Sequence, residues 1–178
     1  MIQGGFAMEE RVMAAAAVEK IRNIRNHNCF GCSPTNDKGL RMEFFPDGDR
    51  VCSIVAVPAH CCGWDKLVHG GVITTIMDEV MSWTAIYRLK VLLLTKSISV
   101  DFLRPVMIEK PLRAVGRVAE ITSDREAVIE GFLYNEKGKE CARSKAVIAT
   151  FTSETIRNLG FMNRDLLAEF EEIMKTYP

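Results

Sequence analysis

The 178-residue sequence has no excess of either charge, because its 23 lysine and arginine residues equal its 23 aspartate and glutamate residues. This balance predicts neither nucleic acid nor an anionic membrane as a partner. No window contains the roughly 20 apolar residues needed to cross a bilayer. The apolar stretch Val12–Val18 is short and acidic residues precede it, unlike a secretory signal. We therefore expect a cytoplasmic protein without nucleic-acid or membrane partners.

Cysteine is too sparse for a disulfide scaffold, with six residues in the whole chain. Cys29 and Cys32 form a Cys-x-x-Cys pair that could belong to a zinc site or a redox centre. The possible zinc partners are His27, His60, Cys61 and Cys62. Structural zinc sites usually show two well-spaced ligand pairs, whereas Cys61 and Cys62 are adjacent and poorly placed to close one tetrahedron. We favour plain loop packing and predict no metal.

The first third of the sequence predicts one helix and one hairpin. Apolar residues recur at helical spacing from Met8 to about Ile24, which indicates an amphipathic helix. Two short apolar runs at residues 40–45 and 51–57 flank the turn Pro46–Asp49 and so predict a β-hairpin. The segment from residue 58 to 68 has little periodicity, and we expect it to be a loop.

The remainder predicts a buried helix followed by antiparallel strands. Residues 71–87 form the most apolar helical segment, and Asp78 lies on a strip separate from its broad apolar face. After Leu94 apolar and polar residues alternate, which is the period of a β-strand, until Pro105 ends the strand. Further strands are predicted at residues 112–121, 127–134 and 141–151, and a last amphipathic helix at 163–175. A curved antiparallel sheet could cover the apolar helix, which favours an α+β fold.

The strongest motif is His69-Gly70-Gly71 followed by Asp78 two helical turns later. It resembles the signature of hotdog-fold thioesterases, particularly the PaaI-like group. The resemblance extends upstream to Cys29-Phe30-Gly31-Cys32, Asn36 and Gly39-Leu40, and downstream to Asp101-Phe102-Leu103-Arg104-Pro105. His-Gly-Gly alone is a weak signal, but the ordered set, spread over roughly residues 29–151, is specific.

The resemblance implies a hotdog fold, with a curved antiparallel sheet wrapped around a central helix and extra helices at both termini. It divides the chain into an N-terminal helical extension (1–28), a thioesterase domain (29–153) and a C-terminal helical tail (154–178). It implies an acyl-CoA thioesterase that needs no cofactor besides the coenzyme A of its substrate. Because hotdog active sites form between subunits, it also implies a homodimer or a dimer of dimers.

The same resemblance suggests catalytic roles that agree with the chemistry of thioester hydrolysis. The reaction needs an attacking oxygen, and hydrogen-bond donors where charge develops on the carbonyl oxygen. The main-chain N–H of Gly70 would supply that donor, with Gly71 allowing close approach. Asp78 would attack the carbonyl or activate water, and the sequence leaves both mechanisms open. His69 would fix the turn or polarise the carbonyl, and Ser82 would orient a water.

Several other residues are candidates for contacts with the substrate. They are Trp64, Asp65, Thr75, Glu79, Arg104, Arg143 and Lys145. The three cations would bind the phosphates of coenzyme A, and Trp64 would line the acyl pocket. Glu79 lies about 100° around the helix from Asp78, so the two carboxylates cannot face the same carbonyl.

Two other functions compete with hydrolysis. Residues 61–66 contain no Asn or Gln, although many relatives carry an amide side chain shortly before His-Gly-Gly. That departure favours a non-catalytic module that binds acyl-CoA, whereas Asp78 favours an enzyme. A hotdog dehydratase would use a separate catalytic histidine, and the sequence has no histidine after His69.

Overall fold

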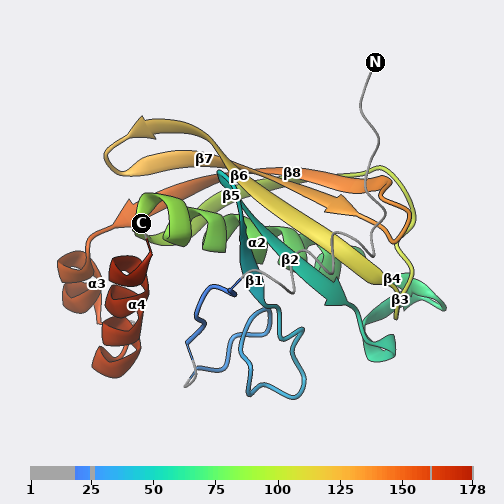
Figure 1. Cartoon of the computed structure of the whole chain (residues 1–178), viewed down its shortest axis with the longest axis horizontal. Helices are drawn as coiled ribbons and strands as arrows, with labels where there is room; N and C mark the ends of the chain where they lie inside the picture. The colour runs from blue at the N-terminus through green and yellow to red at the C-terminus, as the bar shows by residue number, and fades with distance from the viewer. Residues whose placement is uncertain (1–18, 25–26, 161, 178) are drawn as a thin grey trace.

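The computed structural model describes residues 19–24, 27–160 and 162–177, and one long helix packs along the inner face of a curved antiparallel sheet (Figure 1). The elements are β1 (Phe44–Asp47), β2 (Arg50–Ala56), α2 (Gly70–Leu89), β5 (Leu92–Phe102), β6 (Pro111–Ser123), β7 (Glu126–Tyr134) and β8 (Glu140–Phe151). The strand order is β1-β2-β6-β7-β8-β5. This α+β architecture is the one that the sequence predicted.

Two glycines allow α2 to lie close to the sheet. A Cβ atom on Gly116 of β6 would overlap the Thr84 hydroxyl and lie 2.8 Å from the Val80 carbonyl oxygen. A Cβ atom on Gly131 of β7 would lie 3.2 Å from the side chains of Met77 and Met81. Any larger side chain at these positions would push the helix off the strands, so the glycines set the depth at which α2 is held.

The other side of α2 is covered by chain that precedes β1. Ile21, Ile24, Leu40 and Met42 are buried in the same core as α2, and the Ile21 N–H donates to the Phe44 carbonyl oxygen at 2.8 Å. This segment therefore serves as the second layer over the central helix.

The N-terminal predictions need correction at two points. Residues 19–24, the end of the predicted helix, have no helical structure because their backbone is drawn toward β1; residues 8–18 lie outside the described residues. The predicted strand at residue 40 starts only at Phe44. The Leu40 and Met42 N–H groups instead donate to the carbonyl oxygens of Phe30 and Gly31, and Arg41 between them has a φ of 50°.

Four short elements lie in segments where the sequence predicted none. Residues 58–68 contain a 3-10 turn, η1 (Ala59–Cys61), and a small hairpin of β3 (Cys62–Trp64) and β4 (Leu67–Val68). Helix α3 (Ser153–Leu159) follows β8, and α4 (Arg164–Thr176) is the predicted last helix. None of the helices in the described ranges is long and apolar enough to span a membrane.

Candidate active site

The N-terminus of α2 presents one unsatisfied main-chain donor. His69 is the N-cap, and its Nδ1 accepts from the Gly71 N–H at 2.9 Å. The Val72 and Ile73 N–H groups both donate to the His69 carbonyl oxygen, at 2.9 and 3.1 Å. The N–H groups of the N-cap and the next three residues have no partner within a helix, and that of His69 donates to the Cys61 carbonyl oxygen at 3.1 Å. Of these four, only the Gly70 N–H finds no acceptor among the described residues.

The local geometry explains why this turn requires His-Gly-Gly. A Cβ atom on Gly71 would lie 3.1 Å from His69 Nδ1 and crowd the imidazole that caps the helix. Because Nδ1 accepts a hydrogen bond, the neutral ring carries its proton on Nε2 and can donate from there. A Cβ atom on Gly70 would meet the ring of Phe102 at 3.6 Å. The end of β5 therefore lies beside the free N–H.

Asp78 is half-buried on α2, and its position is fixed by one contact. Its Oδ1 accepts from the Thr95 hydroxyl at 2.7 Å. Thr95 lies on β5 and pairs with Ile148, whereas Ser97 pairs with Val147, so Lys96 is an extra residue in the strand. This β-bulge turns Thr95 toward the helix. Sequence analysis missed Thr95 because strict alternation with Ser97 would place it on the outer face.

Gly70 and Asp78 are too far apart in one chain to act on a single carbonyl group. They are separated by eight positions on the same helix, which corresponds to about 12 Å along its axis. A hydrogen bond to the carbonyl oxygen and attack at the carbonyl carbon both require contacts of about 3 Å. One chain therefore carries two half-sites.

Glu79, next to Asp78, faces a different part of the molecule. Its carboxylate accepts from the Cys29 thiol at 3.0 Å, and its side chain lies against Gly31, where any Cβ atom would collide with it. Burial, together with the adjacent Cys29, raises the pKa of Glu79 to about 8. The two neighbouring carboxylates therefore have different environments, as the helical spacing predicted.

Comparisons with known proteins bear on the fold that carries these residues. Residues 65–142, which include α2 and most of the sheet, match the model of the thioesterase superfamily. The match covers this part of the chain, and the whole of α2 with its curved antiparallel sheet is a hotdog fold. Sequence comparison with curated proteins finds no match.

Several solved structures share the fold at low sequence identity. The Escherichia coli PaaI protein is 18% identical over 64% of this chain and 81% of its own, with a TM-score of 0.58. A hypothetical thioesterase of Streptococcus pneumoniae, solved with coenzyme A, is 17% identical over 62% and 85%, with a TM-score of 0.57. Another thioesterase superfamily protein is 17% identical over 84% and 81%, with a TM-score of 0.65. At these identities, the comparisons establish the fold.

The remaining predicted residues lie at varied distances from the two half-sites of this hotdog fold. Thr75 donates its hydroxyl to the Gly71 carbonyl oxygen at 3.0 Å, which ties it to the helix backbone. Ser82 is half-buried one turn after Asp78. Asp65, at a φ of 44°, occupies the turn of the β3–β4 hairpin. Its neighbour Trp64 has 83% of its surface exposed.

The three predicted cations lie on or beyond the sheet rather than around Asp78. Arg104 follows β5 and donates to the Glu140 carbonyl oxygen, while Arg143 pairs with the Glu140 carboxylate at 2.9 Å. Both arginines line a shallow depression of about 640 Å³. Arg104 is two residues beyond Phe102, whose ring lies against Gly70. Only two positions of chain therefore separate Arg104 from a residue that contacts the Gly70 half-site, which is not the case for Arg143 or Lys145.

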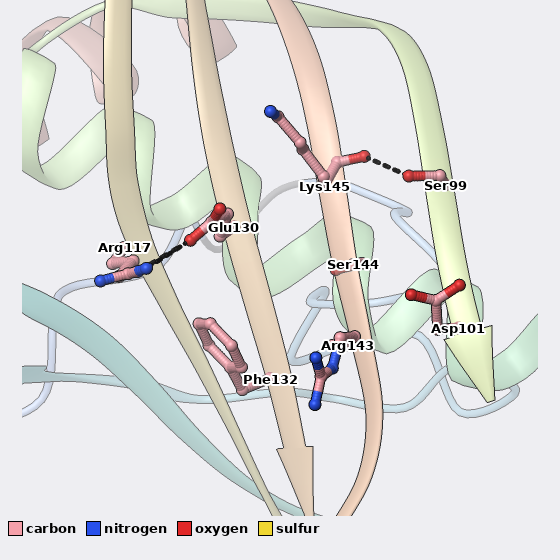
Figure 2. Close-up of a pocket in the computed structure, with 8 residues that line it drawn as sticks. All are labelled: Ser99, Asp101, Arg117, Glu130, Phe132, Arg143, Ser144 and Lys145. Carbon is pink, nitrogen blue, oxygen red and sulfur yellow. Dashed lines mark hydrogen bonds and ion pairs between the residues drawn. The ribbon is translucent and has the colours of Figure 1, made fainter. Parts of the chain in front are cut away.

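A second depression, of about 290 Å³, lies on the outer face of the sheet (Figure 2). Arg143 and Lys145 reach it from β8, on either side of Ser144. Ser144 is buried, and its hydroxyl donates to the sulfur of Met81 on α2 at 3.4 Å. Because side chains alternate along a strand, Arg143 and Lys145 point away from α2. In one chain the sheet separates them from Asp78.

Proposed function

We propose that this protein hydrolyses an acyl-CoA thioester to a carboxylic acid and coenzyme A. The observation that carries the proposal is the combination of a single open N–H, at Gly70, with a carboxylate held at Asp78. Thioester hydrolysis needs this pair of functions, and the match of residues 65–142 to the thioesterase superfamily supports it. Acyl-CoA as the substrate class is supported by the Streptococcus pneumoniae neighbour, which was solved with coenzyme A.

The geometry supports a simple sequence of steps. The substrate carbonyl oxygen accepts from the Gly70 N–H, and the neutral His69 ring donates from Nε2. Asp78 then either takes a proton from an attacking water or attacks the carbonyl carbon itself. The carbon–sulfur bond breaks, and the coenzyme A thiolate leaves. In the second route, water hydrolyses the resulting anhydride. Ser82 is placed to orient the water in either case.

A complete site requires a second copy of the chain. Within the described residues, the edge strand β5 pairs only with β8, and Leu94 and Phe102 on it are 49% and 56% exposed. An open eleven-residue edge with exposed apolar side chains is normally covered. A two-fold axis beside β5 would run the two α2 helices antiparallel and bring Asp78 of one chain toward Gly70 of the other. We propose a homodimer, which a dimer of dimers would preserve.

The substrate contacts follow from this arrangement. Among the three cations, Arg104 is the strongest candidate for binding the phosphates, because it follows Phe102, whose ring lies beside Gly70. Arg143 and Lys145 would act only on a coenzyme A moiety that passes around the sheet edge. Trp64 and Asp65, on the hairpin just before His69, are proposed acyl-group contacts across the dimer.

An assay with a panel of acyl-CoA thioesters distinguishes hydrolysis from binding alone. We expect purified protein to release coenzyme A from at least one aliphatic or aromatic ester, measured with a thiol-trapping dye against a blank containing protein alone. The blank is needed because Cys62 is exposed. A non-catalytic module, which the absence of an amide in residues 61–66 favours, would show a substrate-dependent rise in Tm without thiol release.

Thr95→Val is expected to reduce kcat about 10-fold, because Asp78 would lose the hydroxyl that fixes its carboxylate while the side-chain volume is kept. Steady-state kinetics on the best ester of the panel measure the effect. Thr95→Ser retains the hydroxyl and should restore most of the activity. Equal loss in both variants would show that packing, rather than the hydrogen bond to Asp78, is what matters at this position.

A further inference from the structure

Three potential metal ligands meet beneath α2, away from Asp78. The donor atoms of His27, Cys29 and Cys32 all lie within 4.8 Å of one another, and the Glu79 carboxylate is 3.0 Å from the Cys29 sulfur. We propose that His27, Cys29 and Cys32 bind one structural Zn²⁺ ion, with Glu79 as the fourth ligand. Thiolate, imidazole and carboxylate groups are the ligands that zinc prefers, and four of them complete its tetrahedron.

The state of the His27 side chain supports a ligand at this point. Its Nε2 is buried and has no hydrogen-bond partner in the described part of the chain. Leaving a buried polar atom unpaired is costly, so native proteins nearly always satisfy such atoms. Because a ring nitrogen of His27 lies within 4.8 Å of both sulfur atoms, a metal ion shared with them would satisfy the imidazole.

The Cys29–Cys32 turn is built to hold a thiolate. The Gly31 N–H donates to the Cys29 sulfur at 3.3 Å, which stabilises negative charge on the sulfur as outer-shell donors do in metal sites. Gly31 also has to be glycine, because any Cβ atom would collide with Glu79. The same residue therefore donates to one ligand and makes space for another.

The loop that carries the ligands is held in shape by its own hydrogen bonds. The buried Ser33 hydroxyl donates to the His27 carbonyl oxygen at 2.7 Å and accepts from the Asn36 N–H at 3.2 Å. The side-chain amide of Asn23 donates to the Cys32 carbonyl oxygen. These contacts hold His27 close to the cysteine pair, with the three donor atoms within 4.8 Å of one another, and binding would draw them to Zn–S distances of about 2.3 Å and a Zn–N distance of about 2.0 Å.

The prediction of no metal rested on the poor spacing of Cys61 and Cys62. In the structure these two cysteines lie in η1 and β3, and the cluster contains neither. His27 and Glu79 take their place as ligands, one from beside the cysteine pair and one from α2. The ion would tie the segment that covers α2 to the helix itself, one residue from Asp78. Its expected role is to stabilise the fold.

Metal analysis of the full-length protein tests this proposal directly. After purification under reducing conditions with zinc present, we expect about one zinc per chain. Removal by a chelator should lower the Tm by about 5–10 °C, and re-addition of zinc should restore it. Cobalt substitution should give the ligand-field bands of a tetrahedral site together with sulfur-to-cobalt charge-transfer bands.

The variants identify the ligands. Cys29→Ser and Cys32→Ser should each weaken the charge-transfer bands and abolish stoichiometric zinc, and His27→Ala should also lose it. Glu79→Gln should weaken zinc binding while keeping the charge-transfer bands. Cys62→Ser, a change at an exposed cysteine, should behave like wild type. Zinc far below stoichiometry in the wild-type protein, equal loss in Cys62→Ser, or a Cys29–Cys32 disulfide in the fully folded protein would overturn the proposal. Thioesterase activity is not used in any of these measurements.

Discussion

In the Asp78→Asn variant, kcat for acyl-CoA hydrolysis is expected to fall by about 100-fold or more, the loss typical of removing a nucleophile or general base. An amide has neither the negative charge nor the basicity to attack the carbonyl or to take a proton from water. Its oxygen can still accept from the Thr95 hydroxyl, which is 2.7 Å from Asp78 Oδ1 in the native chain. The Tm and the affinity for a coenzyme A ester should therefore stay close to wild type.

A matched substitution outside both half-sites is the control for this result. Asp124 is exposed in the turn between β6 and β7, so Asp124→Asn removes one carboxylate of the same kind without touching either half-site, and kcat should be unchanged. Wild-type turnover in Asp78→Asn would contradict the assignment to Asp78. A loss of folding instead of turnover would make Asp78 a structural residue.

The sequence was sufficient to predict the central architecture because the relevant signals are local. The apolar face of α2 has helical spacing, and the alternating strands that follow are separated by recognisable turns. The same kind of local signal gave a wrong prediction for the segment before β1. Residues 19–24 have a helical pattern, but Ile21 donates to Phe44, 23 positions along the chain. Long-range pairing of this kind overrides local propensity, and the pattern of one segment carries no sign of it.

The candidate site was likewise predictable from the sequence only in part. One motif was enough to propose His69, Gly70 and Asp78, but Thr95 was hidden by a bulge that reverses the direction of its side chain. The closeness of His27, Cys29, Cys32 and Glu79 was hidden for a related reason. Three of these residues lie in an irregular loop and the fourth on a helix, so only the fold brings them together. The sequence named His27 as a possible partner of Cys29 and Cys32, but it gave no sign that Glu79 lies beside Cys29.

The two half-sites also explain why Asp78 lines neither of the two depressions described above. Both depressions lie toward β8 and the outer face of the sheet, whereas Asp78 and Thr95 lie between α2 and the open edge strand. A substrate cavity at this edge would have its second wall supplied by another subunit. The site and the dimer are therefore one hypothesis, and a test of either should be designed to examine both.

Replacing Gly70 with proline should remove the carbonyl-binding N–H with little disturbance of the helix. Gly70 is the first residue of α2, where proline is well tolerated because its missing N–H has no helical partner. His69 has a φ of −61° and a ψ of 136°, which suits a residue before proline. We expect Gly70→Pro to lower kcat by about 10²–10³-fold, as when one oxyanion donor is lost elsewhere. Gly70→Ala keeps the N–H and should lose far less activity.

Mixing two inactive variants then tests whether each site uses two chains. Unfolding and refolding Asp78→Asn together with Gly70→Pro should form mixed dimers, each with one site that has both native groups and one that has neither. With random assortment, about a quarter of wild-type activity should return. If Asp78 and Gly70 of the same chain acted together, no mixed dimer would contain an intact site and the mixture would stay inactive. Recovery of activity would therefore place the carboxylate and the main-chain donor on opposite subunits.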